Sequence, residues 1–87
     1  MAPIRVIIRS RGPNTWGLGP QGIILNVDNT LQVRGLKTEI QDNGANAETS
    51  RQLLWSVNNR LGDDLQRLVD AGIQDNSIIE LREHILF

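Results

Sequence analysis

The sequence contains no cysteine, and aromatic residues make up only 3% of its 87 residues. The absence of cysteine excludes disulfide bonds, cysteine-ligated metal sites and thiol chemistry. Long apolar runs are missing as well, because the longest, such as Ile23–Leu25, fall far short of the roughly 20 residues that span a bilayer. We therefore expect a protein of the reducing cytoplasm or nucleus that has no membrane contact.

An excess of one charge is also lacking, since nine basic and ten acidic residues give a net charge of −1. The two signs are interspersed along the chain, so the sequence predicts no basic field able to neutralise several phosphates. Nucleic acid is therefore not an expected partner. A chain this short forms one domain, residues 1–87, with little volume to spare for a deep substrate pocket.

No residue pattern indicates catalysis. The single histidine, His84, has no nucleophile paired with it, and Asp63 beside Asp64 fits the cap of a helical turn better than an acid/base pair. The segment 17–22 matches the letters of a dinucleotide-binding glycine motif, but a strand-like segment follows it where that motif needs a helix. We expect no enzyme, no cofactor and no metal.

Two strands are predicted in the first third of the chain. Ile4–Ser10 and Ile23–Val27 both alternate apolar and other residues with the period of a half-buried strand. Residues 11–22 between them hold four glycines and two prolines, which predicts an antiparallel pair around a long loop. In that loop, Trp16 and Leu18 are candidates either for covering the edge of the core or for contacting a partner.

An amphipathic helix is predicted over about residues 31–43. Its apolar stripe consists of Val33, Leu36 and Ile40. Asn29 or Thr30 is the expected cap of the first turn, and Gly44 is the expected left-handed stop.

The next stretch fits two patterns. Leu53, Leu54, Val57 and Leu61 suit a helix, whereas Leu53, Trp55 and Val57 suit the inward side of a strand that turns Leu54 outward. Periodicity alone leaves both open. A short helical turn that begins at Asp63 or Asp64 and stops at Gly72 is expected next, and Ser77–Glu83 alternates as a final strand.

Three parts of the chain resemble ubiquitin-like domains. The segment Ala71–Leu81 resembles the last turn and final strand of that family, Leu36–Asp42 resembles its central helix, and Gln52–Trp55 followed by Leu61–Asp63 is similar to its third strand and the segment after it. The likeness runs from Ile4 to about Ile85. It implies an α+β fold, the ubiquitin-like β-grasp. In this fold a mixed sheet of four to five strands packs on one central helix, with a short second helical turn, and the first strand lies between the second and the last.

The resemblance also decides in favour of a strand at Leu53–Val57. The expected core then comprises Ile4, Val6, Ile8, Ile23, Leu25, Val27, Val33, Leu36, Ile40, Leu53, Trp55, Leu61, Leu68, Ile73, Ile79 and Leu81.

Two departures from the family bear on function. Members that are conjugated to other proteins end in Gly-Gly, and this chain has no Gly-Gly pair, so we expect it not to serve as a modifier. On the sheet face that ubiquitin receptors read, the resemblance aligns Leu54 with an apolar receptor-contact position, but Arg82 and Glu80 bring charge where the family has apolar surface. Receptors of ordinary ubiquitin are therefore not the expected partners.

The outward face of the predicted sheet is the candidate binding site. Three isoleucines on adjacent strands form an apolar centre with a charged rim, which is the usual anatomy of a protein contact. The candidate partner-binding residues are Ile7, Arg9, Ile24, Leu54, Ile78, Glu80 and Arg82, together with Trp16 and Leu18. We expect a non-catalytic protein–protein interaction module, either an adaptor or the N-terminal domain of a larger protein. The alternative is a self-associating assembly domain, a homodimer for example, and a modifier or an enzyme ranks third.

Overall fold

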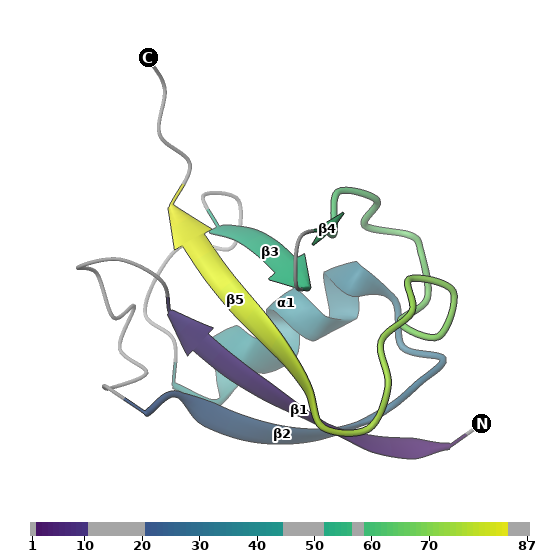
Figure 1. Ribbon diagram of the computed structural model, residues 1–87, viewed down its shortest axis with the longest axis horizontal. Helices are drawn as coiled ribbons and strands as arrows, with labels where there is room; N and C mark the ends of the chain where they lie inside the picture. Colours follow the sequence, from purple (N-terminus) through teal and green to yellow (C-terminus); the bar gives the residue numbers. More distant parts are fainter. Residues whose placement is uncertain (1, 11–20, 45–51, 57–58, 84–87) are drawn as a thin grey trace.

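The computed structural model describes residues 2–10, 21–44, 52–56 and 59–83, apart from the side chains of residues 52, 53 and 83. The elements in these ranges are β1 (Pro3–Ser10), β2 (Ile23–Asp28), α1 (Val33–Asp42), β3 (Gln52–Ser56), β4 (Asn59–Arg60) and β5 (Ser77–Glu83). The strands form one mixed sheet in the order β2-β1-β5-β3-β4, and α1 crosses behind it in Figure 1. The predicted α+β class and the central place of the first strand are confirmed.

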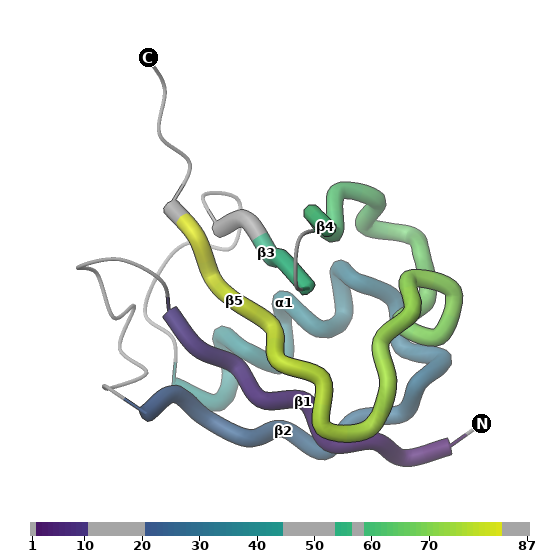
Figure 2. Tube along the Cα trace, viewed as in Figure 1, coloured from purple at the N-terminus to yellow at the C-terminus, as the bar shows by residue number. Residues whose placement is uncertain are grey.

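The pairing of β1 with β5 forms the middle of the sheet. β1 runs antiparallel to β2 and parallel to β5, and Figure 2 shows these strands lying together although they come from opposite ends of the chain. β3 is antiparallel to both β5 and β4. The predicted hairpin and final strand are thus both present.

The core lies between the sheet and α1. Its buried residues are Ile4, Val6, Ile8, Leu25, Val27, Val33, Leu36, Ile40, Leu54, Leu61, Leu68, Ile73, Ile79 and Leu81. Ile23, also predicted to be in the core, is half-buried and packs against this cluster.

The orientation that the sequence predicted for β3 is wrong. Leu54 is 1% exposed and lies opposite the buried Leu81, whereas Trp55 is half-buried and lies opposite Glu80 on the other face. Leu53, Leu54 and Trp55 are consecutive and apolar, so period-two alternation could not choose between the phases, and a shift of one residue exchanges the two faces. The side chain of Leu53 lies outside the described residues.

The cap predicted for α1 is also wrong. Gln32 precedes the helix and makes no side-chain cap, while the Asp28 carboxylate accepts hydrogen bonds from the backbone and hydroxyl of Thr30. The first helical N–H groups donate to backbone carbonyls of a distant segment: Val33 to Gln66 at 2.9 Å and Arg34 to Asp64 at 3.0 Å. The first backbone N–H groups of the helix therefore find their hydrogen-bond acceptors in a distant segment rather than in a local capping side chain.

The segment 63–72, which satisfies the start of the helix, consists of hydrogen-bonded turns. The Leu65 N–H donates to the Asp63 carboxylate at 3.0 Å, as expected of a cap. The Ala71 N–H donates to the Arg67 carbonyl, and Gly72 has φ +81°, so the short helical turn ends where it was predicted to end. This segment docks alongside residues 29–32, because the N–H groups of Leu68 and Val69 donate to the carbonyls of Leu31 and Asn29.

Candidate functional site

The outward face of the sheet, opposite α1, carries three isoleucines in register. Ile7 on β1 lies beside Ile24 on β2 and beside Ile78 on β5. Ile24 is 61% exposed and Ile78 is 42% exposed, while Ile7, between them, is half-buried. These three residues, called here the isoleucine row, form the continuous apolar strip that the alternation of the strands predicted.

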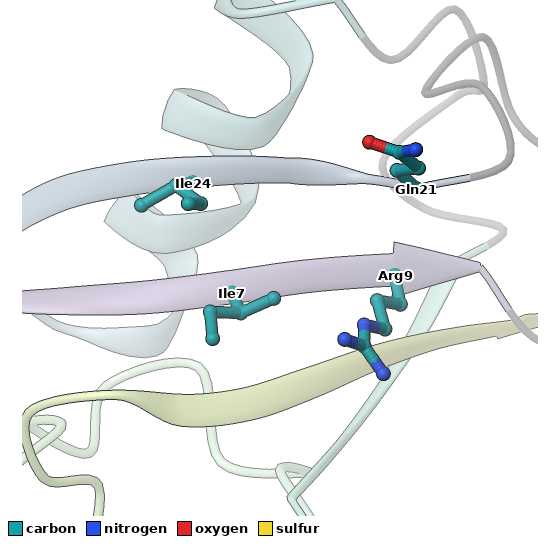
Figure 3. A pocket seen from close by; sticks show the side chains of 4 residues that line it. All are labelled: Ile7, Arg9, Gln21 and Ile24. Atoms are coloured by element: carbon teal, nitrogen blue, oxygen red, sulfur yellow. The ribbon is translucent and has the colours of Figure 1, made fainter.

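A shallow groove of about 440 Å³ lies at the β2 end of the isoleucine row. It is lined by Ile7 and Ile24 together with Arg9 and Gln21, and Figure 3 shows the Arg9 side chain extending from β1 toward β5. The groove thus offers two aliphatic side chains, one cation and one amide in one place. The sequence pattern selects the first three; Gln21 lies just before β2, where alternation gives no signal.

A second set of outward side chains crosses the sheet next to the isoleucine row. The register places Arg9 beside Glu80, Glu80 beside Trp55, and Trp55 beside Arg60. The Arg82 guanidinium lies 4.2 Å from the centre of the Trp55 ring and 2.9 Å from a carboxylate oxygen of Glu80. This stacking and ion pairing hold the Trp55 indole flat under a cation, so an aromatic ring that sequence analysis placed in the core contributes to the outward face instead.

One candidate residue does not join this surface as predicted. Leu54 is wrong as a contact residue, because its side chain is buried on the inner face. Trp55 takes its outward place, and neither strand periodicity nor composition distinguished the two. Trp16 and Leu18 lie outside the described residues.

The charges of the two sides of the domain differ, although they are interspersed in the sequence. The described basic residues of the outward sheet face are Arg5, Arg9, Arg60 and Arg82, against the acids Glu80 and Asp28. The helix and the turns carry Glu39, Asp42, Asp63, Asp64, Asp70 and Asp75 against Arg34, Lys37 and Arg67. Because residues two apart on a strand share a face, strand periodicity gathers arginines that the linear sequence separates by acids. The linear order therefore conceals a local excess of arginine on this face.

The cations concentrate toward one end of the face. Arg9 neighbours Gln21 in the groove, whereas Arg5 lies at the other end of β1, where the Asp75 carboxylate accepts its backbone N–H at 2.8 Å. Asp28 is also at that end, as the last residue of β2. Hydrogen bonds from the backbone and hydroxyl of Thr30 hold the pKa of Asp28 below its ordinary value.

The described residues hold no cluster of three or more His, Asp or Glu side chains suited to a metal ion. On the helix side, the Lys37–Asp64 ion pair at 2.8 Å joins α1 to the segment 63–72, and the Arg67–Asp70 ion pair at 2.8 Å lies within that segment. Across the described ranges, no helix is long and apolar enough to cross a membrane. The site therefore combines exposed apolar side chains with arginines, which suits it to binding rather than to chemistry.

Several solved structures share this fold, although no protein-family model matches the chain and a search of curated proteins found no match. The ubiquitin-like domain of an Arabidopsis thaliana protein, solved by NMR, superposes with a TM-score of 0.80 at 23% identity, over 99% of this chain and 82% of that one. A second NMR structure of the same Arabidopsis protein gives a TM-score of 0.76 at 24% identity, over 98% and 90% of the two chains. Ubiquitin of Caldiarchaeum subterraneum gives a TM-score of 0.78 at 15% identity and covers 98% of each chain. The chain thus has the ubiquitin-like β-grasp fold that its sequence resemblance implied.

Proposed function

We propose that this ubiquitin-like domain is a non-catalytic protein–protein interaction module of the cytoplasm or nucleus, serving as an adaptor or as the N-terminal domain of a larger protein. The observation that carries the proposal is the isoleucine row. Its members lie side by side on three strands, and two of them are 61% and 42% exposed. A contiguous apolar strip edged by charged side chains is typical of a contact surface.

The anatomy of this surface indicates transient binding. The strip is narrow, and interfaces below about 1,200 Å² are typical of transient encounters, so we expect micromolar affinity for a single copy. Conjugation to other proteins forms no part of the proposal.

The experiment compares three forms of the domain as bait in a native cell extract. The forms are wild type, the double variant Ile24→Glu, Ile78→Glu, and a control, Leu65→Glu, which alters a leucine that is 60% exposed in the turn segment. We expect a protein that wild type and control retain and that the double variant loses, and purified copies of that protein must bind the purified domain directly. If the double variant retains the same proteins with the same affinity as wild type, the isoleucine row is not the binding surface and the proposal fails.

Self-association is a second candidate, supported by a different observation. β2 is the outermost strand on its side of the described sheet, and an unpaired strand edge is a template for a second strand. In this case two copies would pair through β2 rather than through their outward faces, where the arginines of one copy would meet those of the other. Sedimentation over a range of concentrations separates the two candidates, since only self-association raises the apparent mass.

A further inference from the structure

We propose that the outward face selects an acidic, aliphatic segment of its protein partner, with an aliphatic side chain packed on Ile7 and Ile24 and a neighbouring carboxylate paired with Arg9. This inference rests on the proposed function and names the chemistry of the partner. The groove itself supports it, because its lining joins two isoleucine side chains to one guanidinium.

Charge complementarity is the first argument for an acidic partner. The chain as a whole carries a net charge of −1, yet on its outward face the described arginines of β1, β4 and β5 outnumber the acids. Of the two acids, Glu80 is held by Arg82 at 2.9 Å, and Asp28 lies at the end of the face away from the groove. An incoming carboxylate therefore meets more arginines than acids on this face, whereas the described helix and turns carry more acids than bases.

Arg9 is the cation best placed to select the carboxylate. It is exposed, and no described residue forms a salt bridge with its guanidinium. Arg82, by contrast, is half-buried and committed to Trp55 and Glu80. A planar guanidinium at the rim of an apolar groove binds a carboxylate through two parallel hydrogen bonds, which adds orientation as well as affinity.

The apolar groove favours a protein segment over a polyanion. A phosphate backbone needs a continuous track of cations. On this face the isoleucine row runs beside the arginines, so a bound polyanion would lie partly on apolar side chains. A second copy of the domain is disfavoured as the occupant because it would bring its own arginines to the same face. In a segment with an aliphatic residue next to Asp or Glu, the aliphatic side chain can pack on the two isoleucines while the carboxylate pairs with Arg9.

The test is selection of binders from a library of random peptides displayed on phage, with the purified domain as bait. We expect selected peptides in which Asp or Glu stands within one or two residues of Leu, Ile or Val. Synthetic copies should bind with affinities that fall as salt is added. Arg9→Glu should lower the affinity of the domain for these peptides about tenfold or more. A repeat selection with that variant should enrich peptides that carry Lys or Arg in place of the acid.

Arg34→Glu is the matched control. It makes the same change of charge at an exposed position of α1, on the other side of the domain, and should leave peptide affinity within about twofold. Circular dichroism and the melting temperature establish that both variants fold as wild type does.

The outcomes separate this inference from the proposed function. If the selected peptides depend on Ile24 and Ile78 but show no acidic preference, or if Arg9→Glu leaves their affinity unchanged, the acidic partner is refuted and the interaction module stands. If no peptide is selected, or if the selected peptides do not depend on the isoleucine row, the inference of an acidic segment is refuted, and the capture experiment alone decides the proposed function. Tighter binding of short polyuridylate or of phosphatidylserine vesicles than of any selected peptide overturns the inference in favour of a polyanion.

Discussion

Replacement of Leu54 by alanine tests the orientation of β3, and with it the composition of the proposed surface. Leu54 is 1% exposed and packs in the core opposite Leu81. Leucine-to-alanine changes at such positions cost about 2–5 kcal/mol, because the site loses apolar contact and retains a cavity. A domain of this length is stable by roughly 4–13 kcal/mol in total, so the expected loss is a large share of its free energy of unfolding.

Urea denaturation followed by far-UV circular dichroism measures this loss directly. The control is Leu65→Ala, which truncates a leucine that is 60% exposed and should change the free energy of unfolding by no more than about 0.5 kcal/mol. Thermal melting provides a second measure, since each kcal/mol shifts the midpoint of a domain this size by about 4–8 °C. A cost for Leu54→Ala no larger than that of the control would refute the assigned orientation and restore Leu54 to the outward face.

Two further changes test other parts of the structure. Gly22→Ala should destabilise the domain by at least about 1–3 kcal/mol in urea denaturation, because Gly22 has φ +75° and a Cβ there would lie 2.0 Å from a backbone oxygen of β1. Gly62→Ala, with its nearest neighbour at 3.9 Å, should be close to neutral, and equal costs would contradict this account. Asp28→Asn should flatten the loss of stability in acid: the lowered pKa of Asp28 adds stability above the ordinary carboxyl pKa, and that stability disappears as the pH falls through the folded-state pKa. The measurement is the free energy of unfolding as a function of pH, and the same loss in acid for Asp28→Asn as for wild type would show that the Thr30 contacts contribute nothing.

Much of the fold could be predicted from local patterns. In β1, β2 and β5 the apolar residues largely occupy one phase of the alternation, so the sequence of each strand is sufficient to identify its inward face. The same regularity placed Ile7, Ile24 and Ile78 on the outward side, and the register of the sheet confirms that they are neighbours.

The errors arose where the deciding contact is distant in the sequence. In β3 the phase is set by the pairing of Leu54 with Leu81 and by the Arg82 guanidinium over Trp55, and neither partner is visible from the strand itself. The start of α1 is completed by carbonyls of residues 64 and 66, so no local capping residue marks it. The clustering of arginines likewise could not be predicted without the order of strands in the sheet. Arg9 on β1 and Arg60 on β4 lie in one line across the sheet because β5 and β3 lie between these two strands.

The parallel pairing of β1 with β5 also determines when the protein can fold during its synthesis on the ribosome. β1 is made early and can pair with β2, but its other edge must wait for β5, the last strand of the described chain. Pairing β1 with β5 closes a loop that contains every other described element, and the chain loses conformational entropy before the hydrogen bonds between the two strands form. We therefore expect this closure, rather than helix formation, to limit the rate of folding. The start of α1 waits as well, since its acceptor carbonyls belong to a later segment. Nascent chains that end before Ser77 should therefore expose the edge of β1 to chaperones, and commitment to the native state comes only after synthesis of the final strand.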